Sequence, residues 1–126
     1  MASVKTNKGR EKLAKAHAGN ISLPKVTKIV FGTGGTDGNG TPKSLTGNES
    51  ALFNQVISKN VTKSFPDNYT ARYSVSINAD ADNLIGKNIN EAGLIDADNH
   101  LVAMKTFTNK GLDTGTTIEF DYDAEF

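Results

Sequence analysis

The stretch Ile89–Phe107, INEAGLIDADNHLVAMKTF, holds two apolar runs on either side of an acidic turn. Asp and Asn side chains bond to their own backbone and tolerate the φ/ψ values of tight turns, so this pattern predicts a β-hairpin. A plain hairpin, however, needs neither the carboxylate nor the glycine that the first strand carries, Glu91 and Gly93. The apolar runs are Ala92–Ile95 and Leu101–Met104.

Glu91 lies between Ile89 and an apolar run, so we expect its carboxylate to be partly buried. A buried carboxylate must be paired or hydrogen-bonded. We favour a structural carboxylate that holds backbone N–H groups or a basic side chain, and a binding role is the alternative. Gly93 indicates a β-bulge or a close approach of another backbone.

Further strands are predicted on both sides of the hairpin. Residues 69–78, YTARYSVSIN, alternate apolar and polar side chains, which is typical of a half-buried strand with one wet face. The last segment, 116–126, alternates in the same way, and Val26–Phe31 reads as a strand after Pro24. A strand is also expected through Val56, Ile57 and Val61, followed by turn chemistry at Phe65–Asn68.

One helix is predicted near the N-terminus, with Thr6 as its cap and Gly19 at its left-handed end. A second helical turn is expected after Asn48. The length of 126 residues fits one domain, residues 1–126. The predicted fold is therefore α+β, with one or two short helices packed on a largely antiparallel sheet of five or six strands.

Composition restricts the classes of function. The chain has no Cys, so disulfide frameworks, thiolate metal sites and cysteine nucleophiles are excluded. No apolar run approaches the roughly 20 residues that span a bilayer, and no apolar signal-peptide core follows the N-terminus. A soluble protein made in a cytoplasm is expected, with no membrane partner.

The formal net charge is zero, but the charges are unevenly distributed. The first 15 residues hold five bases and one acid, whereas the last 15 hold five acids and no base. The basic end lacks the interleaved aromatics of a nucleic-acid site, so no nucleic-acid partner is predicted. Complementary ends favour contacts with neighbouring subunits. The candidate assembly contacts are Lys5, Arg10, Lys12, Asp37, Asn39, Glu119 and Asp121.

The glycine-rich loop Gly32–Ser44 follows a strand and must be tested as a phosphate cradle. It fails as a dinucleotide fingerprint because Asp37 stands where the third glycine belongs, and it fails as a P-loop because Pro42 precedes its lysine. We interpret it as a flexible surface connector and a contact segment that orders on assembly.

The turn Asp96–His100 begins like a calcium loop, but the pattern breaks at His100, at Leu101 and at Phe107, where a bidentate Glu is required. An incidental cation is the minor alternative. The chain has two histidines and no G-x-S-x-G elbow. No catalytic, metal or cofactor site is therefore predicted, and the protein is not expected to be an enzyme.

Four segments resemble the N-terminal domain of bacteriophage tail-collar and tail-fibre proteins, the attachment end of P2-like fibres and related contractile-tail particles. The family's T-x-x-G helix is matched by TNKGREKLAKAHA, its strand and glycine loop by VTKIVFGTGG, and a pre-strand segment by SALFNQVISKNV. The most specific motif, E-x-G-L-hydrophobic-D-x-[DN]-G-x-L-hydrophobic-A, is matched by Glu91–Ala103. The family turn has Gly after Asp or Asn. Here Asn99 and His100 stand in the turn, and Asn tolerates the same left-handed geometry.

The resemblance implies that the motif residues are architectural. It further implies a structural component of a phage tail or tail-like particle, located in the virion. We expect a baseplate or fibre-attachment adaptor, because family members continue into a shaft whereas this sequence ends at Phe126. Other tail proteins would be its partners, in a trimer or ring of copies. The motif residues are Glu91, Gly93, Leu94, Asp96 and Asn99.

Two alternatives remain open. One is a receptor- or carbohydrate-binding module of a tail tip, which requires exposed aromatic residues in a groove. The other is a small hydrolase or metal-dependent enzyme, which requires a surface cluster of carboxylates and histidine.

Overall fold

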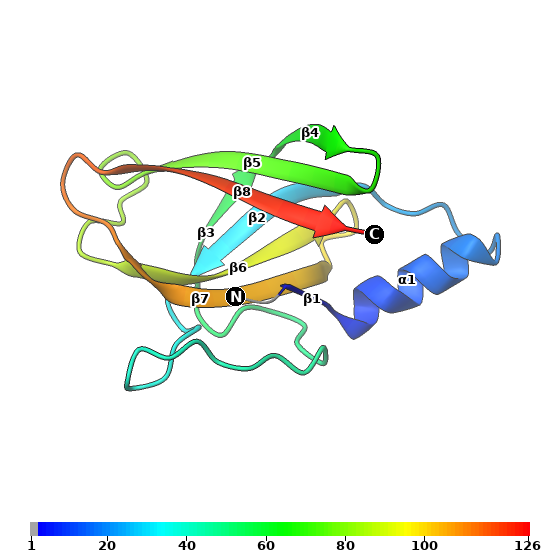
Figure 1. Ribbon diagram of the computed structural model, residues 1–126, viewed down its shortest axis with the longest axis horizontal. Helices are drawn as coiled ribbons and strands as arrows, with labels where there is room; N and C mark the ends of the chain where they lie inside the picture. Colours follow the sequence, from blue (N-terminus) through cyan, green and yellow to red (C-terminus); the bar gives the residue numbers. More distant parts are fainter. Residues whose placement is uncertain (1–2) are drawn as a thin grey trace.

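The computed structural model describes residues 3–126, which form one helix and eight strands (Figure 1). Most of these segments form strands because apolar and polar side chains alternate along them and short turns separate them. In chain order the elements are β1 (Ser3–Lys5), α1 (Asn7–His17), β2 (Val26–Gly32), β3 (Gln55–Asn60), β4 (Thr62–Asp67), β5 (Thr70–Asn78), β6 (Asn88–Asp96), β7 (Leu101–Gly111) and β8 (Thr117–Glu125).

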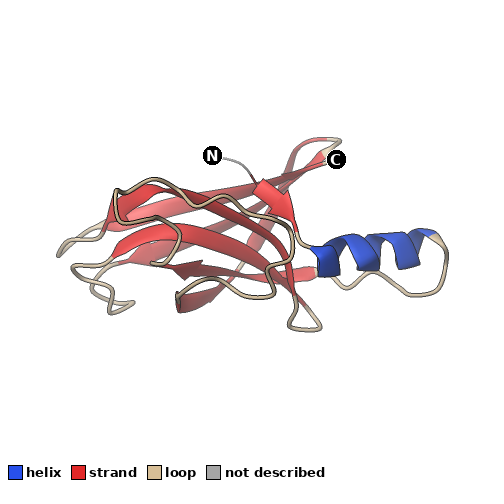
Figure 2. Cartoon of the chain, turned by 90° about the horizontal axis from the view of Figure 1, so that it is seen from below, coloured by secondary structure: helices blue, strands red, loops and turns tan. Residues whose placement is uncertain are grey.

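The strands form two antiparallel sheets that face each other as a sandwich (Figures 1 and 2). The larger sheet has the order β1-β7-β6-β2-β3, and the smaller has the order β4-β5-β8. The hairpin predicted from the opening stretch is confirmed, with Gly93 opposite Met104 and Leu94 opposite Ala103 in the β6–β7 ladder. This hairpin occupies the middle of the larger sheet.

The main core lies between the two sheets, where alternate side chains of each sheet meet. Phe31 of β2 packs edge-on against Phe120 of β8, with ring centroids 5.0 Å apart. Tyr122 of β8 is fully buried, and its hydroxyl group hydrogen-bonds the Ser3 hydroxyl at 2.8 Å. The final strand, whose alternation was predicted, is therefore an integral part of the core.

The predicted α+β fold class is wrong, because residues 3–126 contain a single helix and two sheets instead of one. The physical reason is that the apolar faces of the two sheets cover each other, so no helix is needed to bury them. The residues after Asn48 form no second helix. There the Glu49 carboxylate accepts hydrogen bonds from the backbone N–H groups of Thr46 and Gly47, which holds the segment in a loop.

The division into two sheets occurs at one residue, Val61, which separates β3 from β4. The two strands on either side of this corner pair with different partners, β2 and β5. Strand β4 is exposed along its whole length, so it lacks the alternation from which strands were predicted. It ends at Asp67, and the turn expected over Phe65–Asn68 is thus partly strand.

Residues 33–54 run along the outer face of the larger sheet and cover a second, smaller apolar cluster (Figures 1 and 2). Leu52 of this loop is buried with Val30, Leu101 and Met104, and Leu45 packs against them. The glycine-rich loop is therefore part of a long cover for the sheet. Helix α1, in contrast, projects from one end of the sandwich (Figure 2).

Candidate assembly surface

The start of helix α1 is attached to the β6–β7 hairpin by Thr6. Its Oγ1 atom accepts a hydrogen bond from the Gly9 N–H, which caps the helix, and donates one to the Leu101 carbonyl at 2.6 Å. The backbone N–H of Thr6 also donates to the carbonyl of Val102. A single buried threonine thus caps the helix and fixes it to β7.

Gly9 and Lys12 follow Thr6 at intervals of three residues and face the β6–β7 hairpin. A Cβ atom on Gly9 would collide with the Val102 carbonyl oxygen, so the close approach of helix and strand requires glycine here. Lys12 reaches the end of β6, where its Nζ atom lies 2.5 Å from Oδ2 of Asp96. The T-x-x-G pattern is therefore the docking face of the helix.

The acidic turn is organised around Asp96. Its Oδ1 atom accepts hydrogen bonds from the N–H groups of Asp98 and His100, both at 3.0 Å. Burial opposes ionisation of Asp96, but the Lys12 ammonium and these N–H groups outweigh it, so the pKa of Asp96 lies below its usual value. Asn99 has a φ of 65°, the left-handed geometry that a glycine would otherwise supply.

Asp96, Asp98 and His100 can bring one ligand atom each within 4.8 Å of one another, which is the spacing of a possible cation site. The ammonium of Lys12 bonds both carboxylates, at 2.5 Å to Asp96 and 3.2 Å to Asp98. A protein cation thus already neutralises the acidic side of this cluster.

Glu91 is fully buried beneath the loop and binds both of its ends. Its carboxylate accepts N–H hydrogen bonds from Gly34 at 2.9 Å, from Phe53 at 2.8 Å and from Asn54 at 2.8 Å. In residues 3–126 no basic side chain forms an ion pair with it. The carboxylate thus satisfies backbone donors that would otherwise be unpaired.

Asn90 continues this attachment of the loop. Its side-chain oxygen accepts the Gly35 N–H at 2.6 Å, and its amide nitrogen donates to the Thr36 hydroxyl at 3.0 Å. The β6–β7 register shifts between Ile89 and Glu91, where Asn90 alone stands opposite a longer stretch of β7. A second shift lies between Leu94 and Ile95, directly after the glycine at which a bulge or a close backbone approach was expected.

Gly93 and Leu94 serve the two faces of the same strand. A Cβ atom on Gly93 would press against the Leu101 and Leu52 side chains, so the glycine leaves room for the cover of the outer face. Leu94 points to the opposite side and is buried in the main core. The residues of the family motif thus connect the β6–β7 hairpin to both the 33–54 loop and helix α1.

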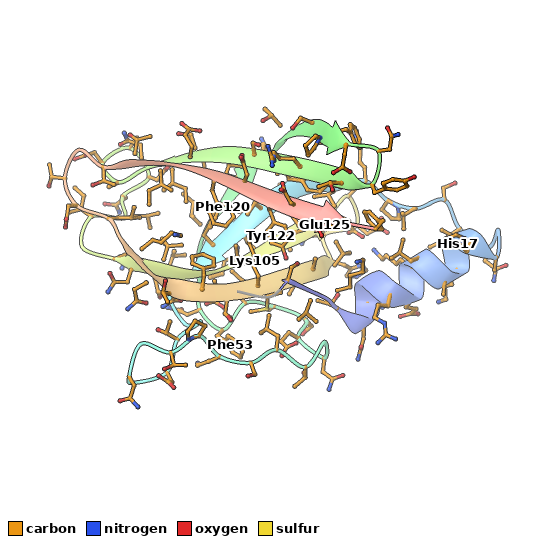
Figure 3. All side chains as sticks on the ribbon, viewed as in Figure 1. His17, Phe53, Lys105, Phe120, Tyr122 and Glu125 are labelled. Carbon is orange, nitrogen blue, oxygen red and sulfur yellow. The ribbon has the colours of Figure 1, made fainter. Side chains whose placement is uncertain are left out.

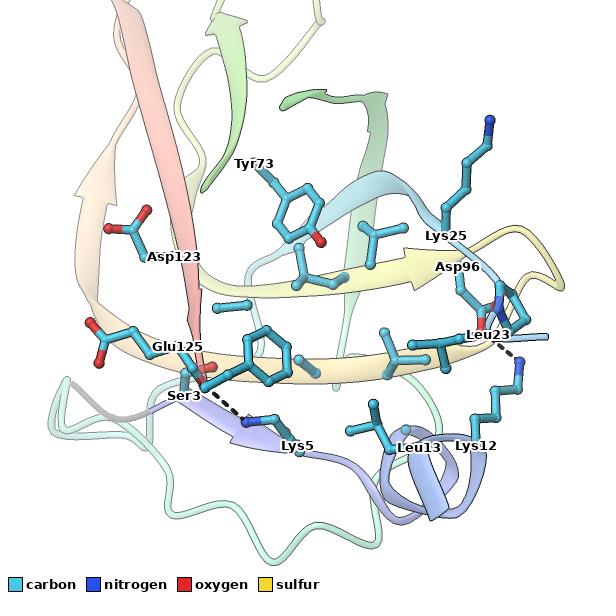
Figure 4. A pocket seen from close by; sticks show the side chains of 18 of the residues that line it. Ser3, Lys5, Lys12, Leu13, Leu23, Lys25, Tyr73, Asp96, Asp123 and Glu125 are labelled. Carbon is cyan, nitrogen blue, oxygen red and sulfur yellow. Dashed lines mark hydrogen bonds and ion pairs between the residues drawn. The ribbon is translucent and has the colours of Figure 1, made fainter. Parts of the chain in front are cut away.

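A hollow of about 580 Å³ opens between the two sheets beside helix α1, and we call it the helix-end groove (Figure 4). The buried side chains of Leu94 and Ala103 lie at its base. Its sides come from the helix, the segment before β2, strands β5 and β7, and the C-terminal residues. The apolar residues that line these sides include Leu13, Leu23, Pro24, Val26, Tyr73, Val102 and Phe126.

Two apolar residues at the groove are unusually exposed, Leu23 at 51% and Phe126 at 71%. The Phe126 N–H donates to the Tyr69 carbonyl at 2.9 Å, which places the C-terminus beside the β4–β5 turn. The β4–β5 hairpin carries two more exposed aromatic side chains, Phe65 in β4 and Tyr69 in the turn. The inward orientation that the alternation predicted for Tyr69 is therefore wrong, and exposed apolar area gathers at this end of the sandwich.

The groove is rimmed by ammonium groups. Lys105 of β7 is half-buried, and its Nζ atom lies 4.4 Å from the ring centroid of Tyr122 and 5.0 Å from that of Phe120 (Figure 3). Burial, only partly offset by Asp123, lowers the pKa of Lys105. The five lysines that line the groove are Lys5, Lys12, Lys25, Lys63 and Lys105.

The contacts predicted from charge lie on different parts of the molecule. Lys5 and Lys12 line the groove, but Lys12 is buried in its ion pair, and Arg10 lies on the exposed side of the helix. The other four are at two places, Asp37 and Asn39 in the turn of the glycine loop and Glu119 and Asp121 on the wet face of β8.

The residues that sequence reasoning missed are those that the fold assembles at the groove. Leu23 and Phe126 are more than 100 positions apart, and neither belongs to a continuous apolar run. Pro24 marked the approach to a strand, but no local pattern marked Leu23 as exposed. Lys105 gave no signal, because a single lysine in a predicted strand is an ordinary polar side chain.

The molecule is thus a small antiparallel β-sandwich with a projecting helix and an open apolar groove. The profile of the phage tail-collar fibre protein N-terminal family matches residues 1–110, so the chain belongs to this family. Its role is accordingly that of a structural phage tail protein, assembled with other tail proteins in the virion. No curated protein and no solved structure matches the chain. Within residues 3–126, no helix has the length and apolar character needed to cross a membrane.

The family match ends before β8 begins. Strand β8 nevertheless pairs with β5 along nine residue pairs and places Tyr122 in the core. The sandwich is therefore completed by a strand that the family profile does not include.

Proposed function

We propose that this chain is an attachment or adaptor subunit of a phage tail or baseplate, and that the end of the sandwich around the helix-end groove is the surface that neighbouring subunits cover. The observation that carries this proposal is the gathering of exposed apolar side chains there. Leu23 and Phe126 lie at the groove, and Phe65 lies on the adjoining hairpin. Exposed apolar area of this kind is typical of protein–protein interfaces.

We further propose that residues 1–126 act as one unit and that copies assemble as a trimer or ring. Support for the unit comes from β8, whose Tyr122 is buried against the larger sheet. Support for several copies comes from the fibre character of the family and from the acidic face of β8, which is complementary to lysine-rich surfaces.

The test measures how much of each variant is incorporated into particles. Leu23→Asp changes the groove, and Ile85→Asp is its control. The two side chains are exposed to the same degree, 51% and 52%, but Ile85 lies in the β5–β6 loop at the opposite end of the sandwich. Tagged full-length chain would be produced together with the particle and detected on tails by gold labelling. We expect Leu23→Asp to reduce labelling and Ile85→Asp to leave it unchanged.

Light scattering of the purified chain would measure the number of copies. A chain that never joins a particle, or a Leu23→Asp variant that is incorporated as well as the wild type, would count against the proposed surface. Circular dichroism of both variants would show whether they fold.

A further inference from the structure

We infer that the helix-end groove binds a peptide segment of a partner tail protein in which apolar side chains alternate with carboxylates, and that one of these carboxylates pairs with Lys105. This inference rests on the proposed function, because it names the chemistry of the partner at the same surface.

The apolar part of the inference comes from the lining of the groove. Leu94 and Ala103 are at its base, and Val102, Leu13 and Leu23 lie along its sides. Figure 4 shows Leu13 and Leu23 beside each other, across from Tyr73. Apolar side chains that enter this hollow would remove the exposed parts of these residues from water, which is the main driving force of association.

The acidic part comes from the balance of charge around the groove. Of the three carboxylates that line it, Asp96 is bonded to Lys12, and Asp123 accepts two hydrogen bonds from Arg72, at 2.8 and 3.0 Å. Glu125 is the remaining carboxylate. Against it stand four ammonium groups, those of Lys5, Lys25, Lys63 and Lys105. The groove therefore has a surplus of positive charge that a negatively charged segment would complement.

Lys105 places the most specific requirement on the bound segment, which is a carboxylate. Within residues 3–126, its ammonium forms no ion pair and donates no hydrogen bond to another side chain, and it is held over the rings of Tyr122 and Phe120 instead. Burial already disfavours its charged form. A carboxylate in the groove would compensate this cost with a partly desolvated ion pair, which is stronger than an exposed one.

The occupant is a peptide and not a cation or a nucleic acid for the same reasons. The lysines repel cations. They would attract phosphates, but the apolar base of the groove would bury a polar sugar–phosphate backbone without hydrogen-bonding it. A glycan would use stacked aromatic rings, but Phe126 is the one strongly exposed ring that lines the groove in the described residues.

The experiment measures binding of three matched seven-residue peptides to the ¹⁵N-labelled full chain by NMR titration. The first alternates Leu with Glu or Asp, the second has Lys in place of each acid, and the third has Ser in place of each Leu. We expect the first to bind at least about tenfold more tightly than either control, with shifts at Val102, Lys105 and Phe126. Rising salt should weaken this binding.

Lys105→Met keeps the apolar stem of the side chain and removes its ammonium. We expect this variant to bind the acidic peptide about fivefold more weakly, whereas Lys87→Met, in the β5–β6 loop, leaves the affinity unchanged. Lys63→Met, at an exposed rim position, should give a smaller loss in the same direction. It supplies the readout if the Lys105 variant does not fold.

Several results would overturn the inference. The first three are equal affinity for the acidic and basic peptides, absence of saturable binding, and shifts that map to another surface. The other two are glycan binding in this groove, and self-association in sedimentation experiments that Leu23→Asp abolishes. If peptides fail but Leu23→Asp still removes the chain from particles, this inference fails while the proposed function stands. If the wild-type chain never joins a particle, the proposed function fails whatever the peptides do.

Discussion

Lys12 and Asp96 form an ion pair in which Nζ lies 2.5 Å from Oδ2 and the two side chains are only 9% and 1% exposed. The pair joins the projecting helix α1 to the end of β6, 84 positions along the chain. Because the helix otherwise touches the sandwich chiefly at the start of β7, this contact fixes the direction in which the helix points. It also shapes the wall of the helix-end groove.

Lys12→Met should destabilise the protein, because it leaves the buried Asp96 carboxylate without its cation. Breaking a buried pair costs up to about 3–5 kcal/mol, but Asp96 keeps two backbone N–H donors here. We therefore expect a loss of about 1–3 kcal/mol in the free energy of unfolding, measured with urea.

Lys15→Met is the matched control. Lys15 pairs with Glu11 on the same helix, at 2.7 Å, but both side chains are about half exposed. Exposed pairs contribute roughly 0–1 kcal/mol, so this variant should change stability little. Equal effects of the two substitutions would show that burial does not strengthen the Lys12 pair.

The contribution of the pair should depend on pH. Burial raises the pKa of Asp96, but Lys12 and the backbone donors lower it more, so the folded-state pKa lies below that of the unfolded chain. A carboxylate shifted in this direction stabilises the fold above its unfolded pKa of about 4, and this stabilisation is lost as pH falls through the folded-state value.

The stability difference between wild type and Lys12→Met should thus be constant near neutral pH and shrink below about pH 4. Burial opposes the charge of Lys12 while its two carboxylate partners raise its pKa above the usual value, so no change is expected on the alkaline side until that lysine titrates. Urea midpoints of both proteins between pH 3 and 8 would measure this. A difference that stays constant to pH 3 would contradict the assignment.

Local patterns predicted the elements whose signal lies within a few residues. The β6–β7 hairpin, the Val26–Phe31 strand, the cap at Thr6 and the alternation of the last strand are all observed, because apolar periodicity and capping chemistry are set by near neighbours. Strand β4 was missed because it is exposed on both faces, so its side chains carry no alternation.

The sheet partition and the groove depend on contacts between distant residues, which no local pattern encodes. The corner at Val61 assigns β3 and β4 to different sheets although only one residue separates them. The groove brings together Leu23, Lys105 and Phe126, from three parts of the chain. The family motif marked Glu91 and Gly93, but only the fold shows that they serve the 33–54 loop and its contact with the sheet.

Glu91→Gln should loosen that loop. An amide has one oxygen that accepts hydrogen bonds, whereas the Glu91 carboxylate accepts three N–H donors, from Gly34, Phe53 and Asn54. The amide nitrogen would face a buried donor, which costs about 1–3 kcal/mol. Hydrogen exchange should show lost protection at these three N–H groups. The control is Glu119→Gln at an exposed position of β8. Protection that survives in the Glu91 variant would show that the loop is held by other contacts.

Gly9→Ala distinguishes a helix docked on β7 from a helix that stands free, because the substitution should lower the stability of the first and raise that of the second. In an exposed helix, alanine is more favourable than glycine by about 1 kcal/mol, so the substitution would stabilise a helix that stands free. Here the new Cβ atom would collide with the Val102 carbonyl oxygen, which is backbone and has little room to move. We expect net destabilisation of about 1–3 kcal/mol, measured by urea unfolding.

The ion pair between Lys12 and Asp96 should weaken in the Gly9→Ala variant, because the helix must shift away from β7. In a Gly9→Ala background, Lys12→Met should then cost less than in the wild type, and a double-mutant cycle measures this coupling. Stabilisation by Gly9→Ala, or additive effects of the two substitutions, would contradict the docking geometry.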